Sequence, residues 1–250
     1  IACEYTLGLS ATPKRKDGLS KVFEWYLGPI IYKQKKKEND DVHIKIINFS
    51  CNDPKYGSEI TNYMGKVNIP SMITYIADLA IRNDIIINEI NNIMADPKRK
   101  IIILSDRRSQ LDTIKNAIEE NNICSVGLYV GGMKQEQLNI SETKDLILST
   151  FNMASEAMDI PLLNTLILAT SKSDIEQSVG RILRQKKEDR AVTPLIVDIV
   201  DNYSIFARQA IKRKKFFEKN NYIFLNSENN GNISNKTEED LFNTDECLID

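Results

Sequence analysis

Residues 146–169 (LILSTFNMASEAMDIPLLNTLILA) contain two short apolar runs, one on each side of a polar segment. Neither run, 146–149 or 163–169, alternates apolar with polar side chains, which is typical of strands buried on both faces of a parallel sheet. Similar runs occur on both sides of this stretch along the chain. Further strands are predicted at 42–48, 101–104, 125–130, 195–200 and 222–225.

Apolar residues at helical spacing fill the intervals between these runs. Amphipathic helices are predicted at 109–121, 173–184 and 203–219, and 69–95 predicts two helices or one helix with a break near Asn83. Strands that alternate with helices form βαβ units. The predicted fold class is therefore α/β, with a parallel sheet flanked by helices.

Composition and charge divide the chain into four parts. Of its 250 residues 42% are hydrophobic and 27% charged, which is enough apolar material for a core. No run approaches 18 consecutive apolar residues, so no transmembrane helix is predicted. A charged linker at 33–41 (KQKKKENDD) separates a short segment, 1–32, from the α/β body at 42–226. The remainder, 227–250, has seven acidic side chains and one lysine, and we expect a disordered acidic tail.

Several classes of site are disfavoured by residue counts. The chain has one histidine, His43, and four well-separated cysteines without a CxxC pair, so neither a zinc site nor a disulfide framework is predicted. Reduced thiols fit an intracellular protein better. The net charge of −2 combines 33 basic with 35 acidic residues. Because the tail is acidic, the body is mildly basic, which permits a polyanionic partner without requiring one.

The segment 174–184 (DIEQSVGRILR) predicts a helix with one chemically distinct face. At 100° per residue, Gln177, Arg181 and Arg184 lie within about 60° of one another, opposite the apolar side chains. Two guanidinium groups on a fixed face suit a phosphate chain, because their N–H groups match phosphate oxygens in pairs. A solvated basic helix face remains the alternative interpretation.

A second segment, 149–161, follows one apolar strand and precedes another. Loops at the carboxyl ends of parallel strands commonly hold ligands. Thr150 and Ser155 offer hydroxyl groups there, and Asp159 offers an acceptor suited to a ribose hydroxyl. An ordinary connection between strands is the alternative.

Weaker signals lie elsewhere. The segment 8–13 (GLSATP) predicts a tight polar loop with hydroxyls at Ser10 and Thr12, although on these residues alone a plain turn is the better interpretation. Basic clusters at 14–16, 107–108 and 212–215 could contact phosphates or could simply be solvated. Arg107 is the strongest of these candidates because it follows a predicted strand.

Taken together, in this order and spacing, these segments resemble the later motifs of superfamily-two helicases of the DEAD/DEAH-like type. Ser10-Ala11-Thr12 resembles the SAT motif, which implies that Ser10 and Thr12 couple ATP hydrolysis to movement on nucleic acid. Residues 101–106 resemble motif four, and 129–132 resemble the segment that follows it. This implies nucleic-acid contacts for Arg107 and Gly131.

The same resemblance assigns roles in the two later segments. Residues 149–161 resemble the motif-five loop, which implies that Thr150 and Ser155 contact nucleic acid and that Asp159 lies near the nucleotide ribose. Residues 177–184 resemble the QxxGRxxR motif six, which implies that Gln177, Arg181 and Arg184 are catalytic and that the two arginines act as fingers on ATP. No metal ligand is implied within this chain.

Longer stretches of sequence around these motifs resemble particular groups of helicases. Residues 8–19 resemble DNA-repair-type and phage-type helicases, whereas 153–161 resemble poxvirus-type transcript-release helicases and their giant-virus and phage relatives. One departure is Ala157, which stands where the family usually has glycine. Alanine tolerates positive φ less well, so the loop that carries Asp159 can differ from the family's.

The resemblance implies that the chain is the C-terminal RecA-like domain of an ATP-dependent helicase, preceded at 1–32 by a remnant of the first RecA-like domain. No GxxxxGK[ST] phosphate loop and no DExx motif occur in the sequence. We therefore expect ATP and Mg²⁺ to be bound mainly by that first domain, which we interpret as cut away before Ile1. The fragment alone is expected to be inactive.

The expected partners are DNA or RNA, the first RecA-like domain of the same chain and the transcription machinery, with no membrane. The expected location is intracellular, in the host cytoplasm or the virion, if the protein is viral. Two other functions stay open from the residues alone. One is a stand-alone nucleic-acid-binding module without ATPase activity. The other is a doubly wound transferase that holds a sugar nucleotide, which leaves the SAT-like segment unexplained.

Overall fold

The computed structural model describes residues 6–9, 19–32, 41–156 and 158–225. The chain divides into two compact units, Ile1–Glu38 and Asn39–Asp250. In the first unit, α1 (Ser20–Leu27) buries none of its residues, and Trp25 is 81% exposed. No described helix is long and apolar enough to cross a membrane.

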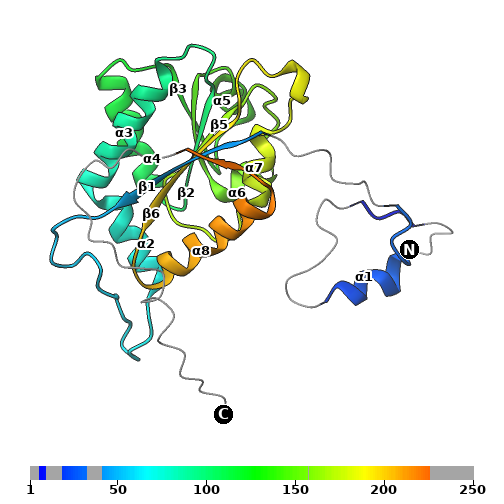
Figure 1. Cartoon of the computed structure of the whole chain (residues 1–250), viewed down its shortest axis with the longest axis horizontal. Helices are drawn as coiled ribbons and strands as arrows, with labels where there is room; N and C mark the ends of the chain where they lie inside the picture. The colour runs from blue at the N-terminus through cyan, green and yellow to red at the C-terminus, as the bar shows by residue number, and fades with distance from the viewer. Residues whose placement is uncertain (1–5, 10–18, 33–40, 157, 226–250) are drawn as a thin grey trace. The chain divides into compact units, whose positions relative to one another are not determined.

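The second unit is built on a seven-stranded sheet in the order β3-β4-β2-β5-β6-β1-β7, in which every pairing is parallel (Figure 1). The strands are β1 (His43–Phe49), β2 (Ile101–Ser105), β3 (Val126–Tyr129), β4 (Leu146–Thr150), β5 (Thr165–Leu168), β6 (Leu195–Asp201) and β7 (Ile223–Phe224). All residues of β2, β5 and β6 are buried, which explains why their sequences are apolar without alternation.

Helices cover both faces of the sheet. They are α2 (Ile69–Asp78), α3 (Ala80–Met94), α4 (Arg108–Glu120), α5 (Gln135–Glu142), α6 (Phe151–Glu156), α7 (Glu176–Ile182) and α8 (Ser204–Lys219), with a short 3₁₀ helix at Lys187–Asp189. Figure 1 shows α3 and α4 on one face and α6, α7 and α8 on the other. Successive strand residues serve opposite faces: Ile103 packs with the α3–α4 cluster, and Leu104 packs with the other cluster.

The predicted parallel α/β fold is confirmed, and the local differences have identifiable causes. The break in 69–95 falls at Leu79, whose extended backbone separates α2 from α3, and not near Asn83. The segment after β4, expected to be a polar loop, begins with α6 because Phe151 and Ala154 are buried against the sheet. Helix α5 was not predicted, since Leu138 and Ser141 alone among its residues are buried.

Two arginine–aspartate pairs are buried at β6. Arg82 of α3 pairs with Asp201 at 3.0 Å, and neither side chain is exposed. Arg213 of α8 pairs with Asp198 at 2.8 Å, with both side chains at most 2% exposed. The prediction that Arg213 belongs to an exposed basic cluster at 212–215 is therefore wrong. Burial raises the pKa of Asp198, and the Arg213 guanidinium opposes that shift.

Substitution of Asp201 by asparagine should lower the free energy of unfolding by about 3–5 kcal/mol, because it leaves the buried charge of Arg82 unpaired. Urea denaturation followed by far-UV circular dichroism measures the change. The matched control is Asp112→Asn, which affects a pair with Arg108 at 4.0 Å whose side chains are 49% and 61% exposed. This control should change stability by less than about 0.5 kcal/mol. Equal effects of the two variants would contradict this account of β6.

Candidate functional site

Three of the predicted nucleic-acid residues lie at the carboxyl ends of neighbouring strands. Tyr129, Ser149 and Leu104 pair across β3, β4 and β2. The residues that follow them therefore emerge at one edge of the sheet, within about 10 Å from first strand to third. Gly131 is exposed at this edge and Thr150 is half-buried. The structure thus brings Gly131, Thr150 and Arg107 to a common edge.

The Arg107 guanidinium is already bonded to protein oxygens. Its Nε donates to Thr74 Oγ1 at 2.8 Å, and its Nη2 donates to the Pro70 carbonyl at 2.6 Å. Its Nη1 donates to the Asp106 carbonyl at 2.8 Å. Arg107 therefore fastens the beginning of α2 to the end of β2. Contact between Arg107 and a phosphate stays a prediction, and it would require exchange of one of these bonds.

The connection between β5 and α7 contributes a lysine that the sequence did not single out. Lys172 lies 3.5 Å from the Asp106 carboxylate, and its ammonium stands 4.6 Å from the centre of the Phe151 ring. A pocket of about 190 Å³ opens beside it, lined by Phe151, Asn152, Ser155, Lys172, Asp174, Gln177 and Ser178. The only sequence signal for Lys172 is that it follows an apolar strand.

Predicted residues from the second and third segments line this pocket together. Gln177 is exposed on α7 and faces the pocket. Ser155 lies on α6, where its hydroxyl donates to the Asn152 carbonyl at 2.7 Å. Ser10 and Thr12 lie outside the described residues, as does Ala157. Among the residues that the structure describes, no group of three or more His, Cys, Asp or Glu could hold a metal ion.

Arg181 binds the backbone of the loop after α6. Its Nη1 donates to the Met158 carbonyl at 2.5 Å, and its Nη2 donates to the Ser155 carbonyl. Its Nε is buried and has no hydrogen-bond partner among the described residues. Arg181 therefore joins α7 to the Ser155 and Met158 carbonyls and has one N–H group, at Nε, that makes no hydrogen bond to the described residues.

Arg184 forms an ion pair with Asp159, so the predicted ATP residues of the two segments meet directly. The Asp159 side chain is 75% exposed and that of Arg184 is 31% exposed. The prediction that Arg184 shares a helical face with Arg181 is wrong, because α7 ends at Ile182. Arg190 donates to the carbonyls of Gln185 and Leu183 and so stabilises the turn that follows the helix.

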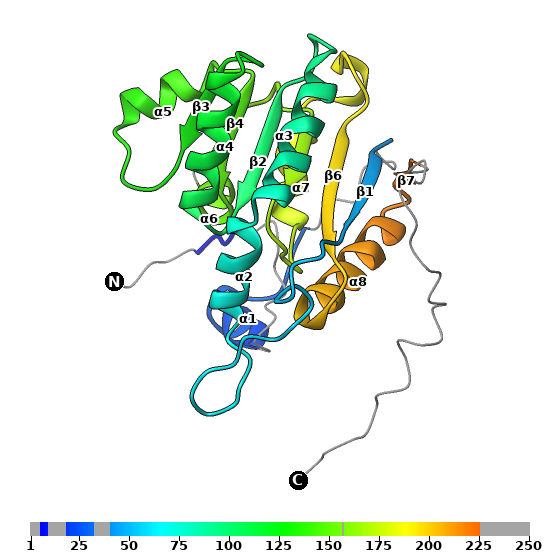
Figure 2. The same ribbon diagram turned by 90° about the vertical axis from the view of Figure 1, so that its left-hand side faces the viewer.

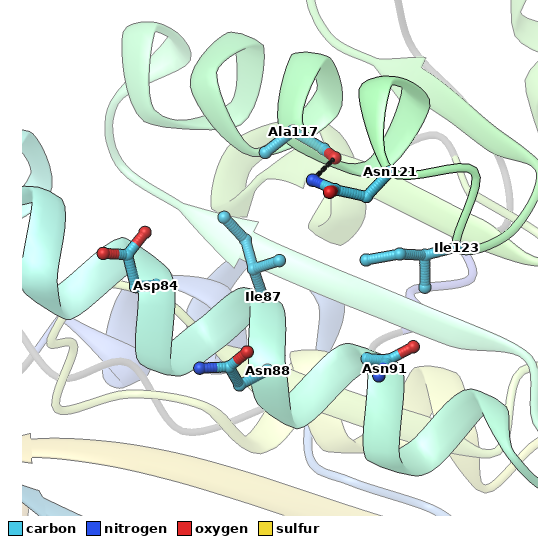
Figure 3. Close-up of a pocket in the computed structure, with 7 residues that line it drawn as sticks. All are labelled: Asp84, Ile87, Asn88, Asn91, Ala117, Asn121 and Ile123. Atoms are coloured by element: carbon cyan, nitrogen blue, oxygen red, sulfur yellow. Dashed lines mark hydrogen bonds between the residues drawn. The ribbon is translucent and has the colours of Figure 1, made fainter.

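A larger pocket lies away from all of these residues. It has a volume of about 570 Å³ and lies between α3 and α4, on the opposite face of the sheet from α6 and α7 (Figure 3). Its lining is Asp84, Ile87, Asn88, Asn91, Ala117, Asn121 and Ile123. Asn121 donates to the Ala117 carbonyl at 2.8 Å within it. None of the site residues predicted from the sequence lines this pocket.

Comparison with known proteins shows that the chain is similar to viral proteins named as helicases. No family model matches. "Putative ATP-dependent RNA helicase L396" of Acanthamoeba polyphaga mimivirus is 37% identical over 230 residues, which cover 89% of this chain and 43% of the relative. "Probable helicase D10" of Escherichia phage T5 is 24% identical, with 89% of this chain and 49% of the relative covered. The chain spans about half the length of the curated relatives it matches.

Solved structures share the fold. T4 UvsW superimposes with a TM-score of 0.53 at 17% identity, over 74% of this chain and 41% of that one. S. cerevisiae Dbp5 bound to RNA and ADP BeF3 superimposes with a TM-score of 0.54 at 11% identity, over 86% of this chain and 50% of that one. At these identities the likeness concerns the fold alone, which is that of a RecA-like helicase domain.

Substitution of Arg181 by alanine should destabilise the domain by about 2 kcal/mol, because it removes two charge-assisted bonds to carbonyls. Hydrogen exchange in residues 151–160 should accelerate in this variant. Arg184→Ala is the matched control, since its pair with Asp159 is partly exposed and should contribute at most about 1 kcal/mol. Equal protection of the loop in both variants would show that Arg181 does not hold it.

The geometry of the site, the similar sequences and the fold all point to a relationship with helicases. Segments that resemble motifs five and six lie against each other through Arg181 and Arg184. The relatives carry helicase names, and the parallel sheet matches RecA-like helicase domains. The resemblance to superfamily-two DEAD/DEAH-like helicases is thereby confirmed: the chain is similar to viral helicases over most of its length, and its sheet has the fold of a RecA-like helicase domain.

Proposed function

We propose that this chain is the C-terminal half of an ATP-dependent helicase or translocase, with residues 42–226 as its second RecA-like domain. The observation that carries the proposal is the contact between the two motif-like segments: Arg184 pairs with Asp159, and Arg181 binds the loop between Ser155 and Met158. This contact brings guanidinium and carboxylate groups together beside the C-terminal ends of α6 and α7. These are the groups that a nucleoside triphosphate requires.

Helix α1 of the first unit is consistent with our proposal that the intact protein contains another RecA-like domain. Helix α1 carries Trp25 and Tyr26, which are 81% and 79% exposed, and buries no residue of its own. A helix with such apolar residues normally packs against a core. We assign 1–32 to the first RecA-like domain, 33–41 to the linker and 227–250 to an acidic tail.

The residues present fit the polyphosphate and ribose of ATP. Arg184 would face the phosphates, and Arg181 would do so after exchanging a bond to the Ser155 or Met158 carbonyl for one to phosphate. Gln177 would support them, and Asp159 would accept a hydrogen bond from the ribose. The buried Nε of Arg181 is a donor that still lacks an acceptor. Mg²⁺ and most of the ATP would be held by the first domain, because the sequence has no phosphate loop. On this basis the fragment alone hydrolyses no ATP.

Little free energy is needed to break the ion pair between Arg184 and Asp159 so that Arg184 can bind a phosphate. An exposed pair contributes at most about 1 kcal/mol, and a phosphate can replace the carboxylate with another charge-assisted bond. Bound ATP supplies the phosphoryl group and the charge that these arginines stabilise during its transfer. The release of Asp159 from Arg184 would leave that carboxylate free for the ribose.

The nucleic-acid track would cross the carboxyl edge of β3, β4 and β2. Gly131, Thr150, Ser155 and Arg107 are its proposed contacts. Small residues and hydroxyls suit the sugar–phosphate backbone more than base edges, so we expect little base specificity and either DNA or RNA as partner. Transcription machinery is a further proposed partner, and an intracellular location, in host cytoplasm or virion, fits this role.

Arg181→Ala and Arg184→Ala in the intact protein should each lower the kcat of nucleic-acid-stimulated ATP hydrolysis by about 10³-fold, as expected for arginines that stabilise transferring phosphate. Steady-state phosphate release measures this, with circular dichroism to establish folding. Lys115→Ala removes a cation of α4 that pairs with Glu119 outside the proposed sites and should leave kcat within about twofold. Turnover retained in both site variants would sink the finger assignment and favour a binding module without ATPase activity.

A further inference from the structure

The connection from β1 to α2 contains an ordered hairpin, residues 60–68. Thr61 and Val67 form an antiparallel bridge, the Asn62 amide donates to the Lys66 carbonyl at 2.8 Å, and the Asn68 amide donates to the Ile60 carbonyl at 2.7 Å. The Asn62 side chain accepts from the amides of Met64 and Lys66 at 2.9 and 3.0 Å. These bonds fix the conformation of the turn that the hairpin presents.

The tip of this hairpin presents an aromatic ring to solvent. Tyr63 is 93% exposed and Met64 is 61% exposed, although the backbone beneath them is held by hydrogen bonds. An exposed ring on a fixed backbone loses little conformational entropy when it stacks on a partner. Lys66 is exposed on the other arm of the turn and adds a positive charge beside the ring.

The hairpin is fastened at its base to the carboxyl edge of the sheet. The Tyr56 hydroxyl donates to the Phe49 carbonyl at 2.8 Å and to Asp201 at 3.1 Å. Asn68 caps α2 by accepting from the Ser71 amide at 3.2 Å, and Arg107 binds the same helix through Pro70. Figure 2 shows this connection projecting beyond the end of the sheet at which β6 ends. The tip therefore extends from the edge that carries Arg107 and Thr150.

We infer that Tyr63 stacks on an unpaired base of the strand that crosses this edge; the inference rests on the proposed function. One aromatic ring contributes about 150–250 Å² of contact, whereas each partner in a stable protein complex buries about 800 Å². By itself the hairpin tip is therefore too small for a stable protein interface. A single ring is sufficient for a base, because every base has a π face, and Lys66 would lie beside the adjacent phosphate.

The test measures binding of the intact protein to fluorescein-labelled single-stranded oligonucleotides, both DNA and RNA, by fluorescence anisotropy. Tyr63→Ala should weaken binding about tenfold or more, the amount expected from loss of one stacked base. Tyr63→Phe keeps the ring and should bind as the wild type does. Leu162→Ala is the matched control, because Leu162 is 58% exposed but precedes β5, at the opposite edge of the sheet.

A base analogue whose fluorescence falls on stacking, 2-aminopurine, supplies the second measurement. Wild type and Tyr63→Phe should quench it at one position of the oligonucleotide, and Tyr63→Ala should not. Wild-type affinity in Tyr63→Ala, or equal loss in Tyr63→Phe or Leu162→Ala, would overturn the inference and leave the proposed function intact. Failure of the wild type to bind any strand would overturn the proposed function and the inference together.

Discussion

Two aspartates buried on β6 must be neutralised, and the arrangement of the carboxyl edge depends on how this is done. Asp201 is paired with Arg82 from α3, and Asp198 with Arg213 from α8. Each arginine also binds the connection that leaves β5: Arg82 donates to the Ala169 carbonyl, and Arg213 donates to Ser171 and to the Lys172 carbonyl. Helices on opposite faces of the sheet thus fix one short segment, 169–172.

This segment in turn holds the elements that carry the candidate site. Thr170 accepts a hydrogen bond from the Asp106 amide at 2.9 Å, and Lys172 lies between Asp106 and the Phe151 ring. The ends of β2, β4 and β5 are therefore held in register at the place where the proposed nucleic-acid track crosses them. Arg181 similarly fixes backbone next to α6 by donating to the carbonyls of Ser155 and Met158. Such hydrogen bonds and packing hold the side chains of a site in a fixed geometry before a ligand binds.

The sheet was predictable from the sequence because runs such as 101–104 and 195–200 are buried on both faces and hence apolar throughout. The positions of the segments at 149–161 and 174–184 were predictable because each follows a recognisable strand, whereas their likeness to motifs five and six came from the resemblance to helicases. Side-chain environments were not predictable: a basic run at 212–215 gave no sign that Arg213 faces inward toward Asp198. Nor could helical spacing place Arg184, because the turn after Ile182 is stabilised by Arg190 from later in the chain. Lys172 and the hairpin tip lacked any periodic signal.

The central proposal is that this RecA-like domain hydrolyses ATP only together with a second RecA-like domain. The most direct test compares ATP hydrolysis by the intact protein and by residues 39–226 alone, each with and without single-stranded nucleic acid. The account predicts hydrolysis by the intact protein that nucleic acid stimulates, and none by the isolated domain under either condition. Hydrolysis by the isolated domain, or an intact protein that hydrolyses no ATP with nucleic acid present, would contradict it.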